Sequence, residues 1–126
     1  SNARDMVRKA RYAQRVVREG GFAFGKVFST CPLNWGADEA KGPEIVEKTV
    51  DACMHPLYEI IDGITSINYD PEKRKKKVPV EEAFGIMGRA YSHLLKPEYA
   101  DILEEVQTEV DRRWAALKAR AESPLL

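Results

Sequence analysis

Residues 22–30, Phe-Ala-Phe-Gly-Lys-Val-Phe-Ser-Thr, constrain the fold more than any other stretch of this sequence. Aromatic and β-branched residues dominate the stretch, and Gly20-Gly21 precedes it. Its apolar residues nearly fill both faces of an extended chain, which predicts a strand buried between helix layers. The N–H and C=O groups of such a strand need neighbouring strands, and the rest of the chain offers few. The sequence therefore predicts one piece of a sheet whose remainder lies outside this chain.

Helical periodicity covers most of the remaining chain. A helix over residues 4–18 is predicted because apolar residues recur every three or four positions and the glycine pair follows. Prolines bound three more helices: from Pro43 to Pro56, from Pro79 to Leu94, and from Pro97 to about Ala121, before Ser123-Pro124. The four apolar stripes consist of Met6, Ala10, Ala13 and Val17; of Ile45, Val46, Thr49, Val50, Cys53 and Met54; of Val80, Ala83, Phe84, Met87, Tyr91 and Leu94; and of Leu103, Val106, Val110, Trp114 and Leu117.

Two further signals complete the expected fold. Asp62-Gly63 separates two β-prone runs, residues 57–61 and 64–69, which predicts a hairpin that packs on another element. Gly85 and Gly88 interrupt the third helix, where such glycines mark a close approach by another backbone. The predicted fold is α+β and mainly helical, with one buried-type strand and one β-hairpin.

Length and charge limit the class of protein. The 126 residues fit one domain, which we assign to residues 4–126 because Ser1-Asn2-Ala3 looks like a cloning scar. Twenty basic and twenty acidic side chains cancel, so there is no bulk electrostatic case for binding nucleic acid or a membrane. No apolar run approaches the roughly 20 residues of a membrane span, and no signal peptide is visible. Two cysteines are too few for a disulfide framework, which favours a reduced, cytoplasmic setting.

Common catalytic signatures are missing from the sequence. It contains no glycine-rich phosphate loop, no Ser-His-Asp pattern and no zinc-ligand spacing. The densest site-like segment is residues 29–36, Ser-Thr-Cys-Pro-Leu-Asn-Trp-Gly, where Cys31 follows the predicted strand. A thiolate there could bind a soft metal, above all an iron–sulfur centre. The alternative is a small buried thiol beside a core tryptophan, and the residues alone favour this alternative.

The series from Phe22 to Gly36 resembles the C-terminal segment of the thiamine-diphosphate-binding β subunit of 2-oxoacid:ferredoxin oxidoreductases. The tail from residue 56 onward is most similar to pyruvate-type β subunits, whereas the loop Thr-Cys-Pro-Leu-Asn-Trp-Gly, residues 30–36, is closer to 2-ketoisovalerate or 2-oxoglutarate relatives. The similarity continues through Pro56-Leu57-Tyr58-Glu59, Asp62-Gly63, Pro79-Val80-Glu81-Glu82, Gly88-Arg89, His93-Leu94, residues 103–107 and residues 110–114.

The resemblance implies a fold, an activity and one site residue. The chain would be a truncated C-terminal piece of an α/β thiamine-diphosphate-binding fold. The intact complex would use thiamine diphosphate, magnesium and 4Fe–4S clusters to decarboxylate a 2-oxoacid oxidatively, form an acyl-CoA and reduce ferredoxin. Cys31 would be the fourth ligand of one 4Fe–4S cluster. Ferredoxin and the other subunits or domains of the oxidoreductase would be the partners.

Departures from the family pattern point to a fragment. The family's Gly-Asp-Gly thiamine/magnesium motif is absent, as are the three other cluster cysteines. One thiolate cannot hold a four-iron cluster, so the isolated chain is expected to carry no cofactor and to be inactive. The competing hypothesis is a non-catalytic helical interaction protein or assembly factor.

For several other residues, the sequence allows both a functional role and a purely structural one. The basic run Lys73–Lys77 could steer an acidic ferredoxin, but a solvated loop is the favoured interpretation. Trp35 either lines a pocket or packs. The apolar stripe of the last helix is expected to be exposed in the fragment and to drive self-association. Core or helix-end roles are expected for Cys53, His55, His93 and Trp114.

Overall fold

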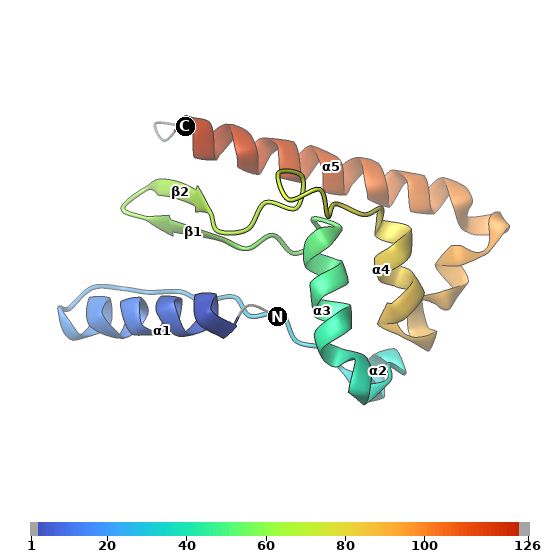
Figure 1. Cartoon of the computed structure of the whole chain (residues 1–126), viewed down its shortest axis with the longest axis horizontal. Helices are drawn as coiled ribbons and strands as arrows, with labels where there is room; N and C mark the ends of the chain where they lie inside the picture. Colours follow the sequence, from blue (N-terminus) through green and yellow to red (C-terminus); the bar gives the residue numbers. More distant parts are fainter. Residues whose placement is uncertain (1–2, 124–126) are drawn as a thin grey trace.

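The computed structural model describes residues 3–123. Ser1, Asn2 and Pro124, which carry the predictions of a cloning scar and a helix stop, lie outside this range. Figure 1 shows α5 running along one side of the molecule, with α3 and α4 beneath it and the hairpin between α5 and α1. The helices are α1 (Ala3–Arg18), α2 (Pro32–Trp35), α3 (Gly42–Asp51), α4 (Val80–Met87) and α5 (Ala100–Glu122); the 3-10 turns are η1 (Glu39–Lys41), η2 (Arg89–Leu95) and η3 (Pro97–Tyr99); the strands are β1 (Tyr58–Ile61) and β2 (Ile64–Ile67).

The predicted buried strand at residues 22–30 is wrong. This segment runs back along α1 without regular secondary structure (Figure 1). Phe22 is 85% exposed and Phe24 is 82% exposed. The two strands within residues 3–123 pair with each other, so no further strand is present there to accept this segment into a ladder. The predicted mainly helical α+β class holds, with the hairpin as its sheet.

The hairpin prediction is confirmed. β1 and β2 are antiparallel, and Ile61 pairs with Ile64 across the two-residue turn. Asp62 and Gly63 both have positive φ, 51° and 82°, as a type I′ turn requires. Thr65 of β2 is buried, and β2 packs on α5, which supplies the neighbour that a lone hairpin needs.

The helix predicted to run to Pro56 ends earlier, at Asp51. Cys53 adopts a left-handed conformation with φ 59°. Its N–H donates to the Val50 carbonyl at 3.0 Å, and the Met54 N–H donates to the Thr49 carbonyl at 3.1 Å. These are the two hydrogen bonds of a Schellman C-cap, which usually has glycine at the left-handed position. Because Cys53 rather than glycine occupies the left-handed position, the sequence contains no C-cap signal there, and the apolar pattern predicted a helix that is too long.

The third predicted helix also divides. α4 ends at Met87, and residues 89–95 form the 3-10 turn η2 rather than a continuation to Leu94. Gly88 between them has φ 128°, a conformation that ends the helix and that side-chain-bearing residues rarely adopt.

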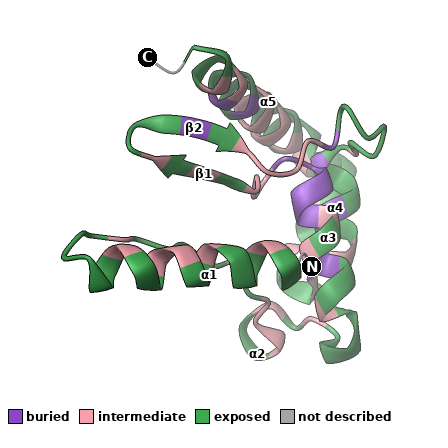
Figure 2. Cartoon of the chain, turned by 60° about the vertical axis from the view of Figure 1, so that its left-hand side comes forward, coloured by how far each residue is buried: buried purple, intermediate pink, exposed green. Residues whose placement is uncertain are grey.

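The stripe of α5 is covered by the chain itself, so the expectation that it is exposed is wrong. Leu103, Val106 and Val110 pack on a core cluster centred on α3 and α4. Trp114 and Leu117 form a second cluster with Cys53. The buried positions in Figure 2 accordingly lie on α3, α4, α5 and β2 and on the segments that follow α3 and β2. The internal cover removes the reason for expecting self-association through this stripe.

α1 forms as predicted but contributes no buried residue. Met6 and Val17, two members of its predicted stripe, are at least half exposed. Polar contacts hold the helix to the hairpin instead: Arg8 donates to the Glu59 carboxylate at 2.6 Å, and the Lys9 ammonium donates to the Tyr58 carbonyl at 3.1 Å. α1 is thus attached at the edge of the fold rather than built into its core (Figure 2).

Candidate functional site

Cys31 stands at the start of the short helix α2, and its side chain is half-buried. The Cys31 carbonyl accepts a hydrogen bond from the Trp35 N–H at 2.9 Å, and the Pro32 carbonyl accepts one from the Ala37 N–H at 3.2 Å. Gly36 closes the turn in a left-handed conformation, with φ 63°. We call residues 31–37 the Cys31 loop. Its backbone is tied by its own hydrogen bonds, and its thiol is not sealed in either core cluster.

The Cys31 loop rests on the junction between α4 and η2. The Arg89 N–H donates to the Gly36 carbonyl at 3.4 Å. A Cβ atom added at Gly88 would lie 2.5 Å from the Trp35 carbonyl oxygen and 2.9 Å from the Ala37 nitrogen. The close approach predicted for the helix glycines is therefore confirmed at Gly88. It is wrong at Gly85, where nothing lies within 4 Å of an added Cβ.

A series of aromatic ring contacts connects the Cys31 loop to the core. The Trp35 ring meets the Tyr91 ring edge-on at 5.7 Å between centroids, and Tyr91 stacks on Phe84 at 5.7 Å. The Phe28 ring is tilted against the Trp35 ring, with 5.8 Å between the centroids. Phe84 is buried in the cluster of α3 and α4. The contacts of Trp35 thus match the packing interpretation of this residue.

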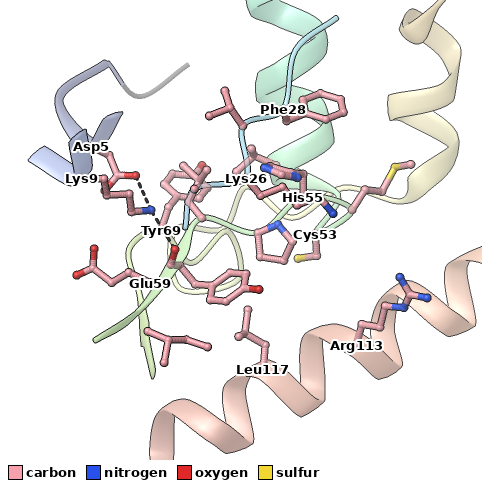
Figure 3. Close-up of a pocket in the computed structure, with 18 of the residues that line it drawn as sticks. Asp5, Lys9, Lys26, Phe28, Cys53, His55, Glu59, Tyr69, Arg113 and Leu117 are labelled. Atoms are coloured by element: carbon pink, nitrogen blue, oxygen red, sulfur yellow. Dashed lines mark hydrogen bonds and ion pairs between the residues drawn. The ribbon is translucent and has the colours of Figure 1, made fainter. Parts of the chain in front are cut away.

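A hollow of about 2060 Å³ opens between α1, residues 22–28, the hairpin and α5 (Figure 3). Its wall is mostly apolar and includes Phe22, Phe24 and Val110. His55 also lines it, and its ring stacks on Phe28 at 5.1 Å. A hollow with these walls is suited to a packing partner rather than to a small polar substrate.

Burial shifts the pKa values of two titratable groups in the hollow, His55 and Cys53. Burial, followed by the charges of Lys26 and Lys9, lowers the pKa of His55. Burial raises the pKa of the Cys53 thiol to about 11, so this thiol stays protonated near neutral pH and is a poor nucleophile. The His55 backbone N–H donates to the Thr49 carbonyl at 3.3 Å. His55 therefore contributes to the helix end by its backbone, and Cys53 belongs to the core, as predicted.

The donor set of this chain does not fit a complete metal cluster. Within residues 3–123, no three His, Cys, Asp or Glu side chains gather so that they could hold a metal ion. The two thiols lie on different elements, Cys31 at α2 and Cys53 after α3, and Cys53 is committed to the core. A 4Fe–4S cluster takes four thiolates, so this part of the chain cannot bind one by itself.

The basic run is largely occupied by the chain's own groups. Lys73 lies 3.8 Å from Asp70, Lys76 lies 3.7 Å from Glu47, and the Arg74 guanidinium sits over the Tyr69 ring at 5.1 Å. Lys77 pairs with both Glu72 and Asp111. Four of the five basic residues thus have partners within the described chain, which leaves less charge for steering a ferredoxin.

Several features of the site were not predicted. The hollow is lined by elements that lie far apart in the sequence, so no local sequence pattern predicts it. His93, by contrast, has the predicted helix-end role. It is exposed near the end of η2, and its carbonyl accepts a hydrogen bond from the Lys96 N–H at 3.2 Å. Its ring meets the Tyr99 ring edge-on, with 5.5 Å between centroids. One sequence feature did predict the contact of Gly88 with another backbone segment, namely a glycine within the apolar stripe of a helix.

Comparison with known proteins finds relatives of one kind. The chain is 34% identical over 104 residues to pyruvate synthase subunit PorB of Thermotoga maritima, which covers 82% of this chain and 31% of that protein. It is 32% identical over 138 residues to the subunit of the same name from Pyrococcus furiosus, covering 98% of this chain and 40% of that protein. It is 35% identical over 96 residues to the subunit of the same name from Methanosarcina barkeri, which covers 75% of this chain and 30% of that protein.

The chain therefore spans about a third of the length of the curated relatives it matches. No family model and no solved structure matches it. In residues 3–123, no helix combines the length and the apolar character needed to cross a membrane.

Proposed function

We propose that this chain is the C-terminal part of the β subunit of a pyruvate:ferredoxin oxidoreductase. The observation that carries the proposal is its similarity to several proteins named pyruvate synthase subunit PorB, which extends over up to 98% of the chain. In the intact complex, a 2-oxoacid is oxidatively decarboxylated to an acyl-CoA and the electrons pass to ferredoxin. Pyruvate is the leading substrate and 2-ketoisovalerate the next. The competing hypothesis of a non-catalytic assembly factor is not favoured by these relatives.

The exposed apolar surface supports the idea that this chain is one part of a larger subunit. Phe22 and Phe24 are almost fully exposed, and together with α1 they border the large hollow. The matched relatives are about three times as long as the aligned region, so a complete subunit has additional chain that could cover this surface. We propose that the remaining part of the subunit packs on residues 22–28. In this proposal, the remaining part of the subunit binds thiamine diphosphate and magnesium and supplies the other three cluster ligands.

Cys31 is the residue of this chain that we propose as a cluster ligand in the intact enzyme. Its half-buried thiol stands on an anchored loop next to the exposed segment 22–30. The other three thiolates would come from outside this chain, because its second cysteine, Cys53, is buried in the core and the described part brings together no three His, Cys, Asp or Glu side chains that could hold a metal ion.

The ligand role is tested by Cys31→Ser in the full-length, assembled enzyme. The variant should lose iron and the electron paramagnetic resonance signal of one reduced cluster. Cys53→Ala is the matched control, since it also removes a thiol, but one from the core. An unchanged signal in Cys31→Ser would reject the ligand role.

The activity is tested by reconstitution. The chain alone should not turn over, whereas the full-length subunit assembled with its complex should reduce ferredoxin when pyruvate and coenzyme A are both present. Replacing pyruvate with 2-ketoisovalerate separates the two substrates. A fully assembled complex that reduces ferredoxin with neither acid would refute the proposal. The coding sequence upstream of Arg4 gives an independent check, since a Gly-Asp-Gly motif and three cysteines are expected there.

A further inference from the structure

Gly88 allows two backbone segments to approach more closely than side chains permit. The position of a Cβ at Gly88 lies 2.5 Å from the Trp35 carbonyl oxygen, 2.9 Å from the Ala37 nitrogen and 3.0 Å from the Ala37 Cα. All three atoms belong to the backbone, so no side chain can rotate away to make room. Gly88 also has φ 128°, which a residue with a side chain rarely adopts. Space and conformation therefore both require glycine here.

The contact is transmitted to Cys31 by a short, hydrogen-bonded path. The Trp35 N–H donates to the Cys31 carbonyl at 2.9 Å, so the residue whose carbonyl faces Gly88 is bonded directly to the cysteine. The facing side is held as well, because Arg89 donates to the Gly36 carbonyl and Trp35 packs on Tyr91. A displacement of Trp35 relative to α4 must then move the backbone of Cys31.

We infer that Gly88 is a positioning residue, which sets the place of the Cys31 thiol by seating the Cys31 loop against the α4–η2 junction. The consequence for a cluster rests on the proposed function, whereas the positioning itself is a property of this chain. A Cβ at Gly88 would have to retreat from 2.5 Å to at least 3.0 Å from the Trp35 oxygen, a shift of about 0.5 Å, which is the tolerance within which a site must be held.

The test compares two glycine-to-alanine variants of the full 126-residue chain. Gly88→Ala introduces the clash at the residue that follows α4, and Gly85→Ala is its control within α4, with open space around the added methyl. The readout is the rate at which Ellman's reagent modifies each thiol. Gly88→Ala should raise the Cys31 rate by about tenfold, equivalent to about 1.4 kcal/mol of local opening. Gly85→Ala should leave it unchanged.

Cys53 serves as an internal reference in the same measurement. Cys53 is buried and belongs to the core cluster that it forms with Trp114 and Leu117. This cluster is separate from the one centred on α3 and α4, which Trp35 contacts. A purely structural role of Gly88 would loosen the whole fold and raise both rates, whereas positioning raises the Cys31 rate alone. Equal acceleration of the two thiols, or an unchanged Cys31 rate in folded Gly88→Ala, overturns the inference.

A second variant covers the case in which Gly88→Ala does not fold. Gly36→Ala places a Cβ 3.1 Å from the Arg89 Cβ on the opposite side of the same junction, and it should accelerate Cys31 selectively but less. No selective change in that variant also overturns the inference. If Cys31 is accelerated as expected but Cys31→Ser retains every cluster signal in the assembled enzyme, positioning stands and the proposed ligand role fails.

Discussion

The Glu72 carboxylate joins the basic loop to α5, and its removal should weaken the fold in a pH-dependent way. One oxygen of Glu72 lies 2.5 Å from the Lys118 ammonium and the other 3.0 Å from the Lys77 ammonium. Lys77 in turn lies 2.9 Å from Asp111 of α5. Lys118 and then Lys77 lower the pKa of Glu72 from 4.5 to about 2. The perturbation is Glu72→Gln, which keeps the side-chain shape and removes the charge.

The expected magnitude follows from that pKa. A fall from 4.5 to about 2 corresponds to roughly 3 kcal/mol if it is fully expressed as folding free energy. Glu72 and Lys118 are each 35% exposed, so water and salt screen their attraction and about 1 kcal/mol is the realistic value. Because the folded-state pKa is lowered, this stability is present above pH 4.5 and is lost as the pH falls toward 2.

The assay is urea unfolding followed by circular dichroism at a series of pH values. Glu72→Gln should be less stable than the natural sequence by about 1 kcal/mol at pH 7, and the difference should close between pH 4.5 and 2. Added salt should reduce the difference at pH 7. Glu104→Gln is the control, an exposed carboxylate on α5 with no ion pair to another described residue. A difference between the natural chain and Glu72→Gln that stays constant with pH would refute the reasoning.

Two further substitutions test the core and the exposed segment. Trp114→Ala should lower the free energy of unfolding by about 3–5 kcal/mol, because Trp114 is 2% exposed and joins α5 to Cys53; urea unfolding measures the loss, and a value below about 1 kcal/mol would contradict the packing. Phe24→Ser should change the free energy of unfolding of this chain by no more than about 0.5 kcal/mol, because Phe24 is 82% exposed. A large loss in a thermal melt would show that Phe24 is covered in solution.

Elements whose signals are local could be predicted from the sequence. Asp62-Gly63 specified the hairpin turn because its two residues adopt the positive φ values that the turn needs. The stripe from Leu103 to Leu117 specified α5 because apolar spacing in a helix is independent of distant residues. Glu109 and Arg113 lie four positions apart on α5 and form an ion pair at 2.7 Å, because this spacing brings two side chains together on a helix.

The prediction for residues 22–30 shows where local composition is insufficient. The aromatic and β-branched residues of this segment favour an extended chain, but a strand exists only where a second strand supplies hydrogen bonds. Within the described chain, both strands are already paired with each other. Residues 22–30 consequently form no strand, and Phe22 and Phe24 stay exposed.

Two glycines of the predicted helix from Pro79 to Leu94 show what the sequence determined by itself and what needed the tertiary structure. From the sequence, Gly85 and Gly88 are equivalent: each interrupts an apolar stripe, and each signals a neighbouring backbone. In the fold, Gly85 faces open space and Gly88 touches the Cys31 loop. Periodicity, turns and helix boundaries arise from interactions between residues a few positions apart, so the sequence contains them. Which glycine meets residues 35–37 depends on how α4 packs against a segment some fifty positions earlier, and only the tertiary structure brings those atoms together.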